Sequence, residues 1–362
     1  MLYWSSFIAG LVLTLFFTPL IRKAALRWNI VDQPSPRKIH SQPIPLLGGS
    51  AIFLSFTLAV IIFWLFGFVT DVKISGYDLM AILAAGLILI VGGFLDDKYN
   101  LKPSRQIIFP ILAVIISLGF GIRIQYVTNP LGGITEFSLV LGTIIAGLWL
   151  LGMIYTTKFL DGLDGLVSGV TFIGSIIIFA VSLSWDIPQS GTSVMALILA
   201  GCALGFLFYN WHPAKIFLGE GGSVFCGFIL GTLAIISGSK IATALLIMGV
   251  PIIDVAWVIL RRLWQGRSPV SPDRKHLHYR LLDFGLSQRQ TVALLYLITG
   301  AFGLTSLFLH TKGKIIALLF LTIFMIITAA GLVVAYRLKL KKINEKNISN
   351  FSQSDDFNRL SK

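Results

Sequence analysis

Two pairs of closely spaced aspartates are the residues of this sequence best suited to chemistry. Asp96 and Asp97 are adjacent, and Asp161 and Asp164 lie three residues apart in the segment Asp-Gly-Leu-Asp-Gly. Adjacent carboxylates repel each other, so a cation or a shared proton is their natural partner. Residues three apart share one face of a helix, and helix capping would explain only one member of the second pair. The glycines would let a phosphate or a metal ion approach the backbone.

Glu220 and two histidines extend this set of polar residues. Glu220 precedes Gly-Gly-Ser, a pattern that would place a carboxylate beside the backbone N–H groups of a helix start. Such a start suits a metal–diphosphate unit. His276 and His278 lie in a basic segment that has too few nitrogen or sulfur ligands nearby for a zinc site. Contacts to phosphate fit these histidines better.

Each motif also has a plain structural interpretation. The adjacent aspartates are compatible with solvated acids at a helix end beside Lys98, and Glu220 with an acid in a first helical turn. The basic segment is compatible with a loop attracted to anionic lipid. Taken together, oxygen ligands favour Mg²⁺ or Mn²⁺, and the surrounding bases suit a polyanionic substrate. The combination predicts metal-assisted phosphoryl chemistry.

The elements that must position these residues are membrane-spanning helices. Hydrophobic residues make up 56% of the 362 residues and charged residues only 12%, compared with roughly 25% charged in soluble domains. The mean hydropathy is +0.85. Cys202 and Cys226 stand in apolar stretches without metal-ligand spacing and imply no disulfide framework. The predicted fold class is therefore an all-α, polytopic membrane helical bundle.

Apolar stretches of bilayer length predict eleven transmembrane helices, each expected to be one continuous span. They run approximately over residues 2–21, 46–67, 78–95, 106–122, 137–155, 165–185, 191–209, 222–238, 240–260, 291–309 and 314–337. The first stretch lacks a basic leading region and a small-residue cleavage site, so we expect a spanning helix rather than a signal peptide.

The basic residues predict the orientation of the bundle. Most of the 29 Lys and Arg fall on connections that share a side with the C-terminus. The positive-inside rule then places the N-terminus outside and the C-terminus in the cytoplasm. This distribution also explains the net charge of +13 without a nucleic acid partner. We expect residues 1–342 to form the membrane domain and the polar tail 343–362 to be disordered.

From about Asp32 to Tyr296, the chain resembles the polyprenyl-phosphate N-acetylhexosamine-1-phosphate transferases. The resemblance rests on Arg37-Lys-Ile-His40 with Gly48-Gly49, the adjacent aspartates, Asp-Gly-Leu-Asp-Gly, His-Pro-Ala-Lys-Ile-Phe and His276-Leu-His278. Motifs in this order on alternate loops are a specific signal. The pattern His-x-His-Tyr-Arg resembles the GlcNAc-type branch more than the peptidoglycan branch, which carries a run of histidines there.

The resemblance implies a reaction and a place for it. The phosphate of a polyprenyl lipid, such as undecaprenyl phosphate, would attack the β-phosphorus of a UDP-sugar, with UDP-GlcNAc favoured. UMP would leave, and the first lipid-linked intermediate of a cell-envelope polysaccharide would form. Mg²⁺, or alternatively Mn²⁺, would bridge the diphosphate. The protein would act in the plasma membrane with its site on the cytoplasmic face, and a homodimer is compatible with this reaction.

The same resemblance implies roles for individual residues. Asp96 or Asp97 would deprotonate or position the lipid phosphate. Asp161 and Asp164 would organise the nucleotide and the metal ion, which Glu220 would also ligate. The residues expected to bind substrate are Arg37, Lys38, His40, Lys158, Asn210, Lys215, Arg274, His276, His278 and Arg280.

Four positions depart from the family pattern, one of which is Leu46, where a basic residue is common. Family members usually carry Asn three and six residues before the first Asp of Asp-Gly-x-Asp-Gly, where this chain has Lys158 and Tyr155. Where the family has a metal-ligand Asp, this chain has Glu220. Glu can bind Mg²⁺ through a longer arm, while Lys158 would either contact phosphate or displace the metal. The alternatives are a peptidoglycan-type phospho-MurNAc-pentapeptide transferase, an inactive scaffold and, more remotely, a transporter with ionisable groups near the bilayer midplane.

Overall fold

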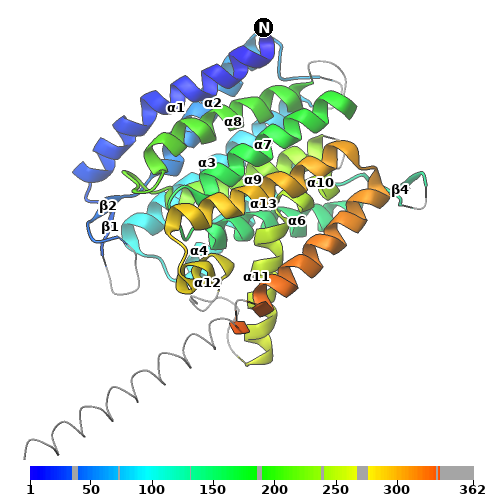
Figure 1. Cartoon of the computed structure of the whole chain (residues 1–362). Helices are drawn as coiled ribbons and strands as arrows, with labels where there is room; N and C mark the ends of the chain where they lie inside the picture. Colours follow the sequence, from blue (N-terminus) through cyan, green and yellow to red (C-terminus); the bar gives the residue numbers. More distant parts are fainter. Residues whose placement is uncertain are drawn as a thin grey trace, which may run out of the picture.

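Apolar runs joined by short polar connections fold here into a bundle of α-helices (Figure 1), which confirms the predicted fold class. The computed structural model describes residues 1–34, 40–71, 74–130, 132–185, 190–237, 240–266, 276–331 and 333–334. Within these residues, sheet is limited to two short antiparallel strand pairs. The predicted tail, 343–362, lies outside the described residues, so its disorder stays a prediction.

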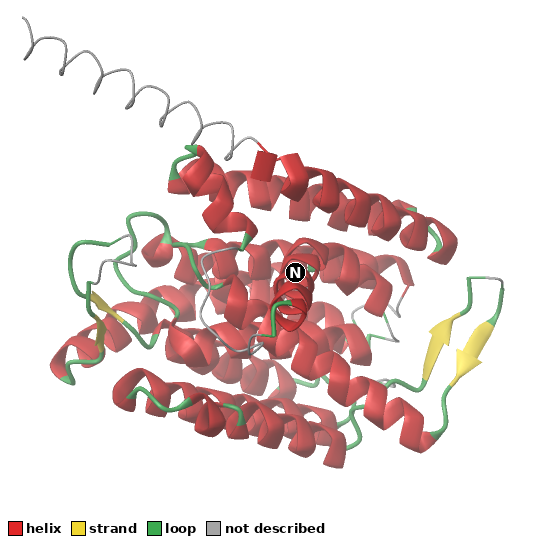
Figure 2. Cartoon of the chain, turned by 90° about the horizontal axis from the view of Figure 1, so that it is seen from below, coloured by secondary structure: helices red, strands yellow, loops and turns green. Residues whose placement is uncertain are grey.

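The elements follow one another in a simple order. They are α1 (Leu2–Arg27), β1 (Val31–Asp32), β2 (Ile44–Pro45), α2 (Gly48–Leu65), α3 (Gly76–Tyr99), α4 (Pro103–Gln106), α5 (Ile108–Gly119), β3 (Tyr126–Thr128), β4 (Ile134–Glu136), α6 (Leu139–Leu160), α7 (Leu166–Trp185), α8 (Gly191–Asn210), α9 (Gly219–Ile236), α10 (Ile241–Ile247), α11 (Gly249–Trp264), α12 (Leu277–Phe284), α13 (Gln288–Phe308) and a helix over Thr311–Gly331. Strands β1 and β2 pair at one end of the bundle, with Asp32 opposite Ile44. Strands β3 and β4 pair at the other end, with Tyr126 opposite Glu136 (Figures 1 and 2). We call the end that carries β1, β2, α4 and α12 the site end.

All eleven predicted segments are mainly helical where the structure describes them, and residues 238, 332 and 335–337 of these segments lie outside the described part. By length and composition, nine helices of the described part can each cross a membrane. Residues 106–122 mainly form α5, whose 12 residues extend about 18 Å, compared with about 30 Å of hydrocarbon. The count of eleven spans therefore stays a prediction.

The segment 240–260 is not the continuous span that the sequence predicts. It forms α10 and α11, which are bent by 77° at their junction. Met248 ends one helix and begins the next, and Pro251 stands in the first turn of α11. A proline is tolerated there because the first N–H groups of a helix have no partner within it.

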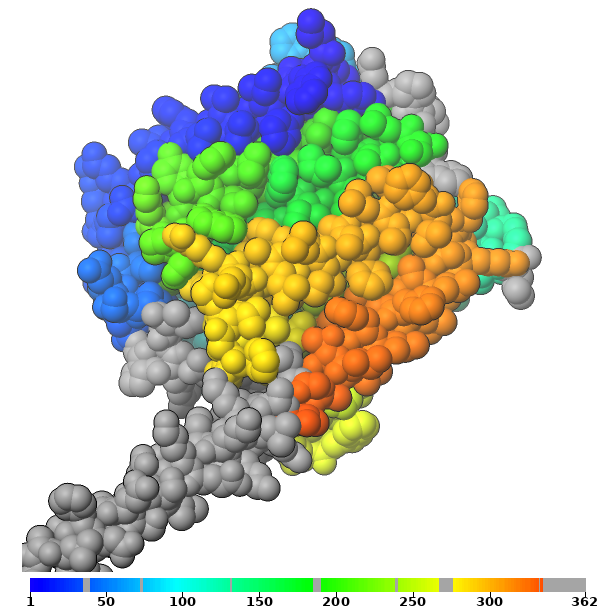
Figure 3. Space-filling view, viewed as in Figure 1, coloured from blue at the N-terminus to red at the C-terminus, as the bar shows by residue number. Residues whose placement is uncertain are grey.

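Burial differs strongly between the central and the outer helices. In α8 and α9, 83% and 89% of the most apolar window is buried, compared with 22% in α1 and 17% in the Thr311–Gly331 helix. Figure 3 shows these two outer helices, in blue and orange, on the surface of the bundle. Their exposed side chains include Phe16 and Phe320. An apolar outer surface around a buried centre is the arrangement that a lipid environment favours.

Candidate active site

Glycines bring α2, α3 and α9 into direct backbone contact at the site end. A Cβ atom on Gly93 would lie 2.0 Å from the nitrogen of Gly221, and one on Gly49 would lie 2.0 Å from the Cα of Gly222. The N–H of Gly49 also donates to the carbonyl of Leu218 at 2.7 Å. Only glycine fits at such distances. This junction fixes the start of α9 beside the end of α3, which carries the adjacent aspartates.

Replacing Gly93 with Ala is therefore expected to separate α3 from α9. Overpacking of this kind costs about 1–3 kcal/mol, so the melting temperature in detergent should fall and transfer activity should fall with it. Thermal unfolding and UMP release on the same preparation measure both effects. Gly152 on α6 is the matched control, because a Cβ atom there would meet nothing within 4 Å. Equal melting temperatures of the two variants would contradict the assigned role of this contact.

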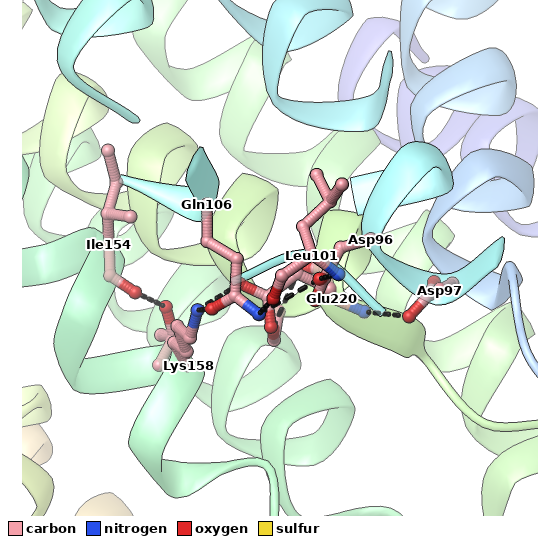
Figure 4. Close-up of polar contacts among 9 residues, drawn as sticks. Asp96, Asp97, Leu101, Gln106, Ile154, Lys158 and Glu220 are labelled. Atoms are coloured by element: carbon pink, nitrogen blue, oxygen red, sulfur yellow. Dashed lines mark hydrogen bonds and ion pairs between the residues drawn. The ribbon is translucent and has the colours of Figure 1, made fainter. Parts of the chain in front are cut away.

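The adjacent aspartates have different partners. The Oδ1 atom of Asp96 accepts hydrogen bonds from the N–H of Leu101 at 2.8 Å and the side-chain amide of Gln106 at 2.9 Å. The Oδ1 atom of Asp97 accepts the backbone N–H of Glu220 at 3.1 Å. Figure 4 shows the two carboxylates turned to these separate partners. Asp96 thus accepts hydrogen bonds from residues that follow the end of α3, while Asp97 links that end of α3 to the start of α9 by a hydrogen bond.

Lys158 joins the same cluster from α6. Its ammonium forms an ion pair with Oε1 of Glu220 and donates to Oε1 of Gln106 at 3.1 Å (Figure 4). The Gln106 amide then donates to Asp96, so three helices and the short α4 share one polar network. Both side chains of the ion pair are 20% exposed, so solvent screens this pair less than it would a surface pair.

The second aspartate pair lies in a turn between α6 and α7, which agrees with the predicted helix bounds 137–155 and 165–185, so the two residues do not share a helix face. The N–H of Asp161 bonds the carbonyl of Thr157 at 3.2 Å and ends α6. The Oδ2 atom of Asp164 lies 2.7 Å from Nδ1 of His212 and accepts the N–H of Ala214 at 3.1 Å. Two glycines in the turn interrupt the helix, and their flexibility favours a loop over a continuous helix.

Asn210, at the end of α8, forms hydrogen bonds with this turn and with the start of α7. Its buried side-chain oxygen accepts the N–H of Gly165 and the hydroxyl of Ser168, both at 3.0 Å. Its side-chain amide donates to the carbonyl of Ile216 at 3.0 Å. These contacts position the turn against the segment that leads to Glu220. The predicted contact between Asn210 and substrate stays a prediction.

The Asp161 carboxylate is electrostatically unusual. Desolvation, followed by the charges of Glu220 and Asp164, raises its pKa from 3.8 to about 7. Asp161 lies at the surface of the site end, yet enough protein surrounds its carboxylate for desolvation to be the largest cause of the raised pKa. Such a group favours a nearby cation or exchanges a proton near neutral pH.

The two histidines form a stack that reaches the Asp161 turn. The rings of His276 and His278 are 5.6 Å apart and nearly parallel, and Phe159 stacks on His276. The Nδ1 atom of His276 lies 2.8 Å from Oδ2 of Asp254, which anchors it. A Cβ atom on Gly162 would lie 2.5 Å from Nε2 of His278. That Nε2 atom is buried and has no hydrogen-bond partner in the part of the chain that the structure describes.

Burial also affects the charge of His278. Desolvation is the main cause that lowers its pKa from 6.5 to about 4, and the neighbouring His276 lowers it further, while Asp254 acts in the opposite direction. His278 is therefore neutral near pH 7 and can act as a hydrogen-bonding group rather than as a cation.

The other predicted substrate-binding residues are distributed around this core. His40 lies 2.9 Å from Asp32 and its ring contacts Phe217, so it borders the segment before α9. Lys215 is exposed, and Arg280 lies on α12 one turn after His276. Three members of the set lie outside the described residues, namely Arg37, Lys38 and Arg274.

Three further polar residues hold the site together although the sequence-based set does not contain them. Gln106 links Lys158 to Asp96, His212 contacts Asp164, and Asp254 anchors His276. An acid in an apolar segment is itself a functional signal, so Asp254 was open to prediction. His212 is the first residue of the motif His-Pro-Ala-Lys-Ile-Phe, on which the resemblance partly rests, whereas a neutral glutamine carries no such signal.

Comparison with known proteins decides the family. The model of glycosyl transferase family 4 matches residues 79–238, which contain both aspartate pairs, Lys158 and Glu220. The probable undecaprenyl-phosphate N-acetylglucosaminyl 1-phosphate transferase of Bacillus subtilis is 34% identical over 319 residues, covering 84% of each chain. The chain belongs to glycosyl transferase family 4.

Other relatives of this family 4 transferase carry related names. The decaprenyl-phosphate N-acetylglucosaminephosphotransferase of Mycolicibacterium smegmatis is 33% identical over 330 residues, covering 84% of this chain and 81% of the relative. The undecaprenyl-phosphate alpha-N-acetylglucosaminyl 1-phosphate transferase of Salmonella typhi is 29% identical over 328 residues, covering 84% of both. The predicted resemblance is thereby confirmed. The relatives do not favour a peptidoglycan-type transferase, an inactive scaffold or a transporter.

The carboxylate oxygens of this family 4 transferase suit Mg²⁺, although the side chains that the structure describes do not by themselves surround an ion. Within the described ranges, no group of three or more His, Cys, Asp or Glu side chains is arranged to hold a metal. Asp97, Asp161 and Glu220 are nonetheless close enough for their charges to interact. Mg²⁺ is usually bound through one or two carboxylates, with substrate phosphates and water completing its shell. These carboxylates supply the type of ligand that Mg²⁺ prefers, and a bound ion would take its remaining ligands from a substrate and water.

Proposed function

We propose that this protein transfers GlcNAc-1-phosphate from UDP-GlcNAc to a polyprenyl phosphate such as undecaprenyl phosphate. The names of the relatives in Bacillus subtilis, Mycolicibacterium smegmatis and Salmonella typhi support the lipid acceptor and the transferred group. UDP-GlcNAc is the donor that the sequence motifs favour.

The proposed reaction exchanges one phosphorus–oxygen bond for another. An oxygen of the lipid phosphate bonds to the β-phosphorus of the donor, and the bond from that phosphorus to the bridging oxygen breaks. UMP leaves with the bridging oxygen, and a lipid-diphospho-sugar remains. Mg²⁺ or Mn²⁺, when bound, supplies positive charge against the diphosphate oxygens. Asp161 and Glu220 are the residues that we assign to hold it.

The observation that carries this proposal is the meeting of α3, α6 and α9 at the site end. There Asp97 Oδ1 lies 3.1 Å from the N–H of Glu220, and Lys158 pairs with the Glu220 side chain. In our proposal Asp97 deprotonates or orients the lipid phosphate, because Asp96 is already bound to Leu101 and Gln106. Lys158 binds donor phosphate, and the His276–His278 stack, which contacts the Asp161 turn at Gly162, binds sugar or phosphate.

We place the site end on the cytoplasmic side of the plasma membrane. Support comes from the Lys and Arg residues on the connections at this end, which the positive-inside rule assigns to the cytoplasm. A nucleotide-sugar donor is itself polar and charged, so an aqueous approach to this end suits it.

Purified protein is expected to release UMP from UDP-GlcNAc only when undecaprenyl phosphate and Mg²⁺ are both present. Coupled detection of UMP measures the rate, and extraction of the product lipid identifies the transferred sugar. Reactions without lipid, and reactions with EDTA, are the controls, and restored Mg²⁺ should restore the rate. Folded protein that releases no UMP with UDP-GlcNAc or related donors would contradict the proposal.

A further inference from the structure

The ammonium group of Lys158 is held in place by side chains from two other elements. It pairs with Glu220 of α9 and donates to Gln106 of α4 at 3.1 Å (Figure 4). A lysine on a flexible stem normally samples many positions. Here two partners from distant parts of the chain restrict the position of its ammonium group. The ammonium is therefore held beside the Glu220 carboxylate.

Gln106 sets the direction in which this ammonium points. Its side-chain nitrogen donates to Oδ1 of Asp96 and to the carbonyl of Leu101, each at 2.9 Å. Because both amide hydrogens are used, the side-chain oxygen must be the atom that faces Lys158. The amide cannot flip without losing two hydrogen bonds, so its oxygen remains the atom that faces the ammonium paired with Glu220.

A cation beside Glu220 competes with any second cation for the same oxygen. The Lys158 ammonium neutralises the carboxylate, and it would repel a divalent ion that approached within a few ångströms. Glu220 is also an assigned ligand for the metal ion. The two uses of one carboxylate exclude each other unless the ammonium has another anion to bind.

We propose that Lys158 makes metal binding depend on the nucleotide-sugar donor. Without donor, the Lys158 ammonium is paired with the Glu220 carboxylate. When the diphosphate of the donor enters, the ammonium moves from Glu220 to a phosphate oxygen, and Glu220 becomes free to act as a metal ligand. The four-carbon stem of lysine permits such a move without a backbone change. This inference rests on the proposed function, because it requires a nucleoside diphosphate sugar as ligand.

The test is the affinity of purified protein for Mn²⁺, followed by electron paramagnetic resonance without lipid acceptor, with and without UDP-GlcNAc. In the absence of donor, Lys158→Met is expected to lower the Kd for Mn²⁺ about tenfold, equivalent to about 1.4 kcal/mol. Addition of UDP-GlcNAc should tighten Mn²⁺ binding by the wild type more than by the variant. Lys98→Met is the matched control, since Lys98 is exposed near the same end of α3 and lies over the Phe94 and Tyr99 rings.

Lys158→Gln provides a second neutral variant that keeps a hydrogen-bonding group, and thermal unfolding checks that each variant is folded. Unchanged or weaker Mn²⁺ binding by the folded neutral variants would overturn the inference. So would a wild type whose Mn²⁺ affinity does not respond to UDP-GlcNAc, a result that needs no variant. Transfer is not part of this measurement. A Lys158 effect without UMP release would reject the proposed function alone, and UMP release without a Lys158 effect would reject only this inference.

Discussion

Replacing Asp97 with Asn is expected to lower UMP release by about 10²- to 10⁴-fold, the contribution typical of general acid–base catalysis. Asn has nearly the same shape and can still accept the N–H of Glu220, which lies 3.1 Å from the Asp97 carboxylate. The contact between α3 and α9 should therefore survive. What the variant loses is the negative charge and the capacity to take a proton from the lipid phosphate. Steady-state UMP release and thermal unfolding of one preparation separate these two properties.

Asp96→Asn is the closest comparison, because the two residues are neighbours on the same helix. The Asp96 carboxylate accepts hydrogen bonds from Leu101 and Gln106, which an amide oxygen can also accept. We expect its rate to fall by no more than about tenfold. Asp78→Asn, in the capping box at the opposite end of α3, controls for a general effect on this helix. Full activity of Asp97→Asn, or equal losses at both positions, would show that Asp97 lacks the assigned role.

Glu220→Gln is expected to lower transfer by about 100-fold or more, whereas Glu220→Asp should be tolerated. Removal of a metal ligand is at least as severe as removal of a group that orients one, which typically costs about 10- to 100-fold. Asp keeps the charge on a side chain one methylene shorter, and the flexible Lys158 can follow it. The measurement is the rate of UMP release against Mg²⁺ concentration. Equal rates of the two variants would remove Glu220 as a metal ligand.

The Lys158 partner provides an internal control for this experiment. Glu220→Gln leaves a partly buried ammonium without its carboxylate, so the melting temperature should also fall. The double variant Lys158→Met with Glu220→Gln removes both charges and is expected to recover the melting temperature but not the transfer rate. Recovery of both would mean that the single variant failed through instability alone.

Much of the fold could be predicted because its sequence signal is local. Each apolar stretch is long enough to be recognised without knowledge of its neighbours, and in the described part of the chain each predicted segment is mainly helical. The bend between α10 and α11 was not predicted, because hydropathy averages over a stretch and does not register a change of direction at Met248. The predicted helix bounds 137–155 and 165–185 already leave Asp161 and Asp164 between two helices, where the structure has a turn.

The composition of the site was only partly open to prediction. Acids and histidines at the ends of apolar segments can be recognised in the sequence, because charge near hydrocarbon is unfavourable and is usually functional. Gln106 gives no such signal. Its importance comes from its place between Lys158, 52 residues away, and Asp96.

The sequence by itself determined that this protein is a membrane bundle of helices. In lipid every backbone N–H and C=O must be satisfied within the protein, and long apolar segments can achieve this only as helices. The tertiary structure decided which polar residues meet. Asp97 contacts Glu220 from 123 residues away because glycines let α3 and α9 touch, and Lys158 reaches the same carboxylate from α6. Such contacts depend on how helices pack, a property that no single segment of the chain encodes.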